Sequence, residues 1–229
     1  MYNYVQLKKI DCVKMKNVKA VIFDIDGTLL DTTEFIFKSY EHTFKTHGIP
    51  LKSRRKLSVI FGKPLEECYR LLVPSLDIDK LCKTHMFFQL NNLHLVRPFV
   101  NTKKTLKLLK GSGIKIAAVT TRSKLTSIKS LIISRIEKYI DIVISREDVK
   151  NPKPHPESIF SVLEKLGVKA KESVMVGDTD VDIKTGKNAG VRTIGVTYGF
   201  NGLNKDKVIK IKPDVLVDDI SDIVSLILG

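Results

Sequence analysis

The sequence predicts an α/β fold: a doubly wound, mostly parallel sheet with a helical domain inserted into it. Short runs rich in Val and Ile alternate with helical patterns along most of the 229 residues, which is typical of parallel strands joined by crossover helices. One early interval, 34–96, contains helical patterns and no strand. The length suffices for one domain that carries a smaller insertion.

Six short apolar runs are the expected strands. Each run is apolar along its whole length, as in strands that are buried on both faces of a parallel sheet. A polar or glycine-bearing turn follows each of them. The runs lie at 19–25, 114–120, 140–145, 173–177, 192–197 and 214–219.

Helical patterns alternate with these strands. They lie near 101–112, 122–135, 156–167, 179–190 and 219–228. Three glycines stand where the residue after a helix adopts a left-handed conformation, at Gly111, Gly167 and Gly190. We therefore interpret "GSG" at 111–113 as a helix stop and assign it no phosphate-binding role.

The wholly helical interval is expected to be a cap domain inserted between the first and second strands of the sheet. Its entrance, "DTTE", is a capping-box pattern with Asp31 as N-cap and Glu34 three residues later. The chain then divides into a basic N-terminal extension, a core and a cap, at 1–17, 18–33 with 97–229, and 34–96.

The composition favours a small anionic partner. The formal net charge is +14, but the lysines are scattered and no aromatic side chains interleave with them, as a nucleic-acid stacking platform would require. We therefore expect a small anionic substrate and no nucleic-acid partner. The oligomeric state is left open.

No membrane or secretory segment is expected. No apolar stretch reaches the roughly 18 residues that a membrane helix requires, and the start lacks the apolar region of a secretory signal. The expected location is the cytoplasm.

The cysteines predict neither a zinc site nor a disulfide framework. Cys12, Cys68 and Cys82 are widely separated and form no Cys-x-x-Cys pair. Cys82 and His85 would supply only half a metal site, so we expect a buried thiol beside a surface histidine.

Acids, hydroxyls and lysines follow four of the expected strands. Ligands of open α/β sheets bind beyond the carboxyl ends of the strands, so these side chains are expected at one edge. Together they suit a divalent cation with a phosphate. In chain order they are Asp24, Asp26, Gly27, Thr28 and Asp31; Thr120, Thr121 and Arg122; Lys150 and Lys153; and Asp178, Asp180 and Asp182.

Two aspartates after the first strand suit phosphoryl transfer. Mg²⁺ prefers oxygen ligands from one or two carboxylates, waters and phosphate, and Asp24 and Asp178 could each give one oxygen. Asp24 could also attack phosphorus as a nucleophile. Asp26, two residues on, could protonate the leaving oxygen and later deprotonate water.

The other polar residues of this edge divide into candidates and bystanders. Gly27 allows the backbone to turn where a side chain would crowd the ligand. Thr120 and Lys153 supply a hydroxyl donor and a positive charge for the phosphate oxygens. Asp180 is expected to be solvated, and His155 to be a loop residue beside two prolines.

Four segments, "DIDGTLLD", "VTTRS", "NPKPHPES" and "GDTDVDI", occur in this order. They resemble the four motifs of the haloacid dehalogenase-like (HAD) hydrolases, and more narrowly the phosphoglycolate phosphatase group, whose helical cap lies between the first two motifs. The resemblance extends from Val18 onward and includes "GKPLEE" and "GVTYGFN". It implies a Rossmann-like HAD core.

The resemblance also implies roles for the motif residues. Asp24 would be the nucleophile and Asp26 the acid and base, while Thr120 and Lys153 hold the phosphoryl group. Mg²⁺ would be bound by Asp24, the Asp26 backbone carbonyl and Asp178, with Asp182 as a further ligand, direct or through water. We assign substrate contacts to Gly27, Thr28, Thr121, Arg122 and the cap residue Lys63.

The chain departs from the family pattern in two places. Val100 and Asn101 stand after "RPF", where proline and glycine are usual, but Asn101 is a good N-cap for the helix that follows. Thr121 replaces the usual Asn or Ser after Thr120 and keeps a hydroxyl.

The predicted function is a Mg²⁺-dependent phosphomonoester hydrolase that forms an aspartyl phosphate. Its expected substrate is a small acidic phosphorylated metabolite, with phosphoglycolate first, because Lys63 in "FGKPLEE", beside Gly62, suits a remote carboxylate or second phosphate. An equally open interpretation of that segment is the first turn of a helix, with Pro64 at N1. Asp26 excludes the dehalogenase reaction, which needs no acid.

Three alternatives remain open. One is a pyrophosphatase of the same fold. Another is a sugar-phosphate mutase, although mutase relatives usually carry a residue other than Thr28. The third is a non-catalytic basic binding module, against which the four complete motifs argue.

Overall fold

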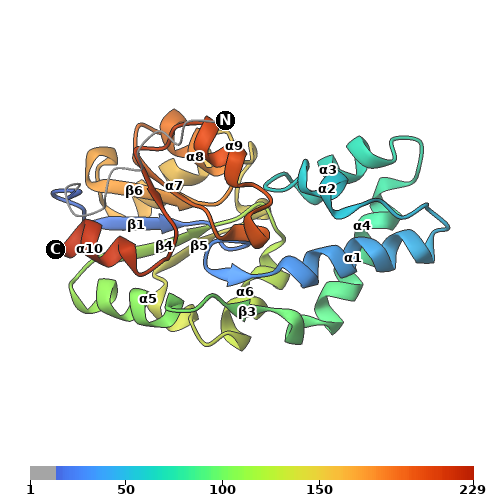
Figure 1. Cartoon of the computed structure of the whole chain (residues 1–229), viewed down its shortest axis with the longest axis horizontal. Coiled ribbons are helices and arrows are strands. Elements are labelled where there is room, and N and C mark those ends of the chain that lie inside the picture. The colour runs from blue at the N-terminus through green and yellow to red at the C-terminus, as the bar shows by residue number, and fades with distance from the viewer. Residues whose placement is uncertain (1–13) are drawn as a thin grey trace, which may run out of the picture.

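The computed structural model describes residues 14–229 and contains a six-stranded parallel sheet (Figure 1). Its strand order is β5-β4-β1-β6-β7-β8. Strands β4 and β5 are added on one side of β1 and strands β6 to β8 on the other, so the topological switch point lies beside β1. All six expected strands are confirmed. Their bounds are β1 Ala20–Phe23, β4 Lys115–Val119, β5 Ile142–Ile144, β6 Ser173–Gly177, β7 Arg192–Val196 and β8 Val215–Val217.

Helices cover both faces of the sheet, which makes the fold doubly wound as predicted. One face packs against α5 (Thr102–Gly111), α6 (Lys124–Ile133) and α10 (Asp222–Leu228). The other packs against α7 (Glu157–Leu166) and the end of α8 (Asp180–Asn188). Val21 and Phe23 of β1 face the first layer, and Ala20 and Ile22 face the second. Because both faces are buried, the strands are apolar throughout.

Four helices form a segment at one end of the molecule (Figure 1). They are α1 (Thr33–Thr46), α2 (Arg54–Ser58), α3 (Leu65–Leu72) and α4 (Ile78–Asn91), and we call residues 33–91 the cap segment. It has its own cluster of buried side chains, rich in Phe and Tyr. A short antiparallel pair, β2 (Leu30–Asp31) and β3 (Arg97–Pro98), lies where the chain enters and leaves. The exact division into domains stays a prediction.

Several predicted helix ends differ from the structure by one or two residues. The N-cap of α1 is Thr32; Asp31 still accepts a hydrogen bond from the Thr33 backbone N–H, but Glu34 pairs with Arg54 and closes no capping box. The left-handed glycine after α5 is Gly113, not Gly111, which ends the helix itself.

Asn101 does stand at the N-cap of α5, but its side chain does not cap the helix. The residue is left-handed, and its amide donates to Asp219. Gly167 and Gly190 are left-handed, as predicted. Pro64 stands one position before the first residue of α3 instead of at N1.

The structure adds short elements and one attachment that the pattern did not reveal. Helix α9 (Lys205–Lys210) is only six residues long, too short for a periodic signal. Within the predicted extension, Met15 is buried against the core and its backbone N–H donates to Leu226 at 2.7 Å. Residues 1–13 of that extension, including Cys12, lie outside the described residues.

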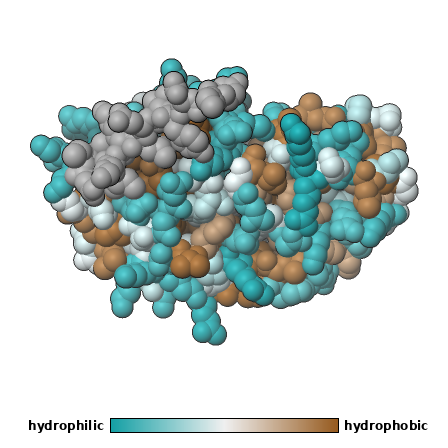
Figure 2. Space-filling model, in the orientation of Figure 1, coloured by the Kyte–Doolittle hydropathy of each residue, from teal (hydrophilic) through white to brown (hydrophobic). Residues whose placement is uncertain are grey.

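The visible surface of both ends of the molecule carries hydrophilic side chains spread over it, with apolar residues interspersed (Figure 2). This distribution agrees with scattered charge. Among the described residues, no helix has the length and apolar content needed to cross a membrane.

Candidate active site

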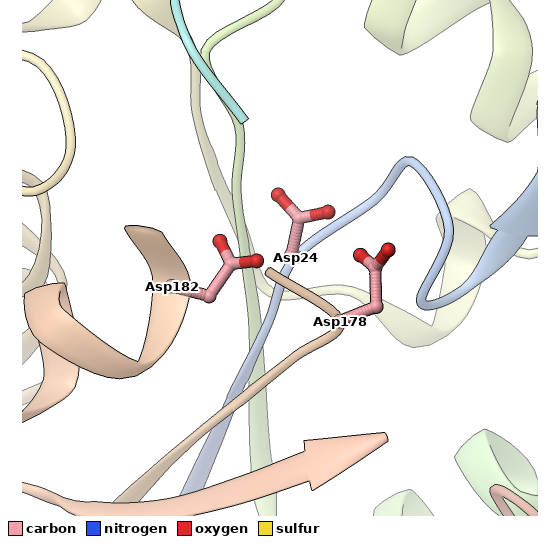
Figure 3. A group of neighbouring side chains, drawn as sticks. All are labelled: Asp24, Asp178 and Asp182. Carbon is pink, nitrogen blue, oxygen red and sulfur yellow. The ribbon is translucent and has the colours of Figure 1, made fainter. Parts of the chain in front are cut away.

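Three carboxylates meet at the carboxyl edge of the sheet (Figure 3). Asp24 follows β1, Asp178 follows the adjacent β6, and Asp182 lies in the first turn of α8. One oxygen from each lies within 4.8 Å of the others, and all three residues are buried. Neighbouring strand ends thus bring together residues that are more than 150 positions apart in the chain.

Lys153 joins two of these carboxylates. Its Nζ lies 2.5 Å from Asp24 Oδ1 and 2.6 Å from Asp182 Oδ1, and it also donates to the Val119 carbonyl at 3.2 Å. The side chain is 2% exposed. One lysine charge therefore offsets part of a buried cluster of three carboxylates.

The remaining oxygens of the cluster differ in what they contact. Asp182 Oδ2 accepts hydrogen bonds from the backbone N–H and hydroxyl of Thr179, which caps α8. Asp178 Oδ1 accepts one from the Thr28 hydroxyl at 3.2 Å. Asp178 Oδ2 is buried and has no hydrogen-bond partner among the described residues.

The cluster has a deficit of positive charge. Burial, opposed by Lys153, raises the pKa of Asp24 to about 8, and burial together with Asp182 and Asp24 raises the pKa of Asp178 well above its ordinary value. Burial alone would lower the pKa of Lys153, but Asp182 and Asp24 raise it. A divalent cation with oxygen ligands fits this set, because it would neutralise the carboxylates and occupy the orphan oxygen of Asp178.

Gly27 is required by the close approach of the chain to Asp178. Its φ is +85°, and a Cβ there would lie 2.5 Å from Asp178 Oδ2. Any side chain would displace the carboxylate. The glycine at this turn therefore leaves the space that Asp178 occupies in the cluster.

A cavity of about 370 Å³ opens from this edge toward the cap segment. Of the predicted catalytic residues, Asp24, Asp26 and Thr120 line it; Lys153 is not among the lining residues but contacts Asp24. Of the predicted substrate contacts, the cavity is lined by Thr121, Arg122 and Lys63.

Two predicted substrate contacts lie elsewhere. Thr28 is fully buried and its hydroxyl is used on Asp178, while Gly27 lies against that carboxylate. Neither lines the cavity, because the turn after β1 aims both toward β6. Asp180 pairs with Lys184 outside the carboxylate cluster, and His155 is exposed, both as predicted.

His85 is not the surface residue we expected. It is 2% exposed and lines the cavity; its Nδ1 lies 2.8 Å from the Tyr69 hydroxyl and its Nε2 lies 3.1 Å from the Gln89 amide nitrogen. Burial lowers its pKa to about 3, so the ring is neutral. Both ring nitrogens are used, and Cys82 is buried as predicted.

The sequence patterns did not reveal several cavity residues. Arg146, after β5, lines the cavity together with Tyr40 and Gln89 of the cap segment and Phe200 of the loop after β7. Phe200 packs on Phe61, with ring centroids 4.3 Å apart. An arginine soon after a strand end was the one available signal, since cap residues depend on how the helices pack.

The comparisons with known proteins agree with this architecture. A family model described as haloacid dehalogenase-like hydrolase matches residues 21–196, and the chain belongs to that family. The pyrophosphatase PpaX of Halalkalibacterium halodurans is 35% identical over 213 residues, which cover 92% of this chain and 97% of that protein.

Solved structures extend the likeness to nearly the whole chain. A predicted phosphoglycolate phosphatase from Haemophilus somnus has a TM-score of 0.82 and 25% identity, covering 93% of this chain and 99% of that one. A provisionally named β-phosphoglucomutase from Thermotoga maritima has a TM-score of 0.72 and 26% identity, covering 92% and 100%. The protein is a phosphatase of the HAD family.

Proposed function

We propose that the protein is a Mg²⁺-dependent phosphomonoester hydrolase that acts through an aspartyl phosphate on Asp24. The observation that carries the proposal is the buried cluster of Asp24, Asp178 and Asp182 with Lys153 between two of its carboxylates. Such a cluster beside a cavity suits a dianionic phosphoryl group bound with a metal ion. A structural acid cluster would need no cavity.

In the first step, an oxygen of Asp24 forms a bond to phosphorus while the bond from phosphorus to the leaving oxygen breaks. Asp26 gives its proton to the leaving oxygen. Lys153 and the Thr120 hydroxyl hold the phosphoryl oxygens, where negative charge must be stabilised. Lys153 also keeps Asp24 in position, since its ammonium contacts that carboxylate.

In the second step, Asp26 takes a proton from water, and the water oxygen attacks the aspartyl phosphate. Phosphate leaves and Asp24 is regenerated as a carboxylate. Asp24, the Asp26 backbone carbonyl and Asp178 would hold Mg²⁺, with Asp182 as the further ligand. When bound, the ion supplies positive charge that offsets the carboxylates and stabilises the transferring group.

The proposed substrate is a small acidic phosphorylated metabolite. Arg146 lines the cavity, and no carboxylate among the described residues forms an ion pair with it; its Nη1 donates only to the Val149 carbonyl. Lys63 of the cap segment also lines the cavity and pairs with Glu67. These cations suit a leaving group with its own negative charge, such as the glycolate of phosphoglycolate.

Phosphate release in the presence of Mg²⁺ or EDTA tests this function, over a panel of phosphoglycolate, pyrophosphate, nucleotides and sugar phosphates. We expect metal-dependent turnover that falls by about 10⁴-fold or more in Asp24→Asn. Asp180→Asn is the matched control, because that acid begins α8, two residues after Asp178, but pairs with exposed Lys184 outside the cluster. Full turnover in EDTA, or an active Asp24→Asn, would contradict the mechanism.

The comparisons favour one other substrate and one other reaction. Pyrophosphate is favoured by the likeness to PpaX, and its second phosphate suits the same cations. A mutase is favoured by the likeness to the β-phosphoglucomutase; it would convert β-glucose 1-phosphate only when glucose 1,6-bisphosphate is added. The ranking of phosphoglycolate against pyrophosphate, and that mutase assay, decide among them.

A further inference from the structure

The carboxylate of Asp26 is held by one side chain. Arg122 Nη1 lies 2.6 Å from Asp26 Oδ1, and the two side chains are 9% and 14% exposed. Among the described residues, Asp26 Oδ1 has this partner and Oδ2 makes no side-chain hydrogen bond. Since Asp26 lines the cavity, the pair leaves one oxygen available there.

Arg122 is itself held at several points. Its Nη2 donates to the Thr126 carbonyl at 3.0 Å and to the Ser130 hydroxyl at 2.6 Å, both in α6. Its guanidinium carbon lies 5.4 Å from the centre of the Phe35 ring in α1. A planar guanidinium fixed on one edge by α6 presents its other edge in one direction, and that edge meets Asp26.

Most donors of Arg122 are therefore used on the protein. Nη2 is engaged with α6, Nη1 is engaged with Asp26, and Nε is buried without a partner among the described residues. A residue that only bound substrate would present its free fork to the cavity. Arg122 instead presents Nη1 to the carboxylate of Asp26 and Nη2 to α6.

We propose that Arg122 is the positioning residue of Asp26: anchored on α6, it binds Oδ1 so that Oδ2 faces the leaving oxygen and, later, the attacking water. The inference rests on the proposed function, in which Asp26 transfers those protons. A misplacement of about 1 Å in a catalytic group can cost about 100-fold in rate, so this anchor affects the chemistry although Arg122 transfers no proton.

Leaving-group dependence separates positioning from binding. We would measure kcat/KM for 2,4-dinitrophenyl, p-nitrophenyl and phenyl phosphate. In this order the leaving oxygen becomes more basic, so its departure depends more strongly on a proton. The variants are Asp26→Asn, Arg122→Gln, Arg122→Lys and Ser130→Ala. Lys129→Gln is the control, because it removes a positive charge from an exposed position of the same helix.

We expect Asp26→Asn to lower kcat/KM little for the dinitrophenyl ester and by about 10²–10⁴-fold for the phenyl ester. Arg122→Gln should show the same trend with a loss of up to about 100-fold on the phenyl ester. Ser130→Ala should lose roughly two- to tenfold on that ester, and Lys129→Gln should change neither.

Each other pattern has one meaning. Suppose that the loss in Asp26→Asn depends on the leaving group, but that Arg122→Gln lowers kcat/KM equally for all three esters. The positioning inference is then overturned while the proposed function stands. If Asp26→Asn itself shows no trend, the acid and base assignment fails. Should Arg122→Gln not fold, Arg122→Lys, which keeps the charge but loses the planar fork, and Ser130→Ala decide the question by the same trend.

Discussion

The core edge and the cap segment both bury polar groups next to the cavity, but they balance them differently. At the core edge, three carboxylates share one lysine, so negative charge is left over. In the cap segment, His85, Tyr69 and Gln89 form a neutral hydrogen-bonded chain among aromatic side chains. The first arrangement needs an ion to be complete, and the second is complete as it stands. We therefore associate the core with the reaction and the cap with the shape of the substrate.

The largest effect is expected when the lysine that offsets the carboxylates at the core edge is removed. Lys153→Met would leave buried carboxylates without their cation, which costs about 3–5 kcal/mol in the free energy of unfolding. Turnover should fall by about 10²–10³-fold, since a group that stabilises the transferring phosphoryl is lost. Phosphate release and urea unfolding, each with Mg²⁺ and with EDTA, measure both effects.

Mg²⁺ should restore part of the stability that Lys153→Met loses, because the ion neutralises the same carboxylates. Lys150→Met, at an exposed position of the same loop, is the control and should behave like the unaltered protein. An equal loss of stability with and without Mg²⁺ would show that no ion binds at the cluster.

Next in size is the pH dependence of the metal-free core. The pKa of Asp24 is raised from 3.8 to about 8, and that of Asp178 is raised too, so the folded protein binds more protons than the unfolded chain in this range. The contribution to stability is fully present below the unfolded value and is lost as pH rises through about 8. In EDTA, Tm should therefore fall between pH 6.5 and 8, and Mg²⁺ should flatten or reverse the slope. Calorimetric scans in both conditions provide the measurement; identical slopes would contradict the metal site.

The cap segment should show the opposite pH dependence. The pKa of His85 is lowered from 6.5 to about 3, so the unfolded chain binds the extra proton. The neutral ring contributes stability above pH 6.5 that is lost as pH falls toward 3. His85→Gln should cost about 1–3 kcal/mol at pH 7, because hydrogen bonds within a buried network are lost.

The same substitution should also make stability less sensitive to acid. The difference in free energy of unfolding between His85→Gln and the unaltered protein should shrink from pH 7 to pH 4.5, as urea titrations at both values would measure. His94→Gln is the control, since His94 is not buried. A constant difference would mean that folding does not lower the pKa of His85.

The same contrast explains how far the sequence could predict the molecule. Core side chains such as Asp24 and Asp178 directly follow apolar strands, so recognising the strands was enough to bring the carboxylates to one edge. Thr28 was misplaced because strand periodicity ends at Phe23 and the turn redirects its side chain to Asp178. His85 and Gln89 were not predicted because helical spacing shows which residues share a face and does not show what that face meets.

The smallest expected effect is a change in KM, and it is tested by removing one cation from the cap and one from the core. Lys63 of the cap pairs with Glu67, and both side chains are more than a third exposed, so the pair contributes little to stability. Arg146 of the core has no such pair among residues 14–229. For an acidic substrate, Lys63→Ala should raise KM by a few-fold and Arg146→Gln by roughly tenfold, as expected for losing a charge-assisted hydrogen bond.

The KM of p-nitrophenyl phosphate, whose leaving group carries no second charge before cleavage, should change little in either variant, and kcat should change little throughout. Steady-state kinetics with phosphoglycolate, pyrophosphate and this ester measure both variants side by side. A larger effect of Lys63→Ala than of Arg146→Gln would move recognition of the acidic group from the core wall to the cap. An unchanged KM in Lys63→Ala would remove that lysine from the site. Unchanged KM values in both variants would remove the requirement for an acidic leaving group. The reason is that the only other lysine or arginine among the described lining residues, Arg122, is already engaged with Asp26.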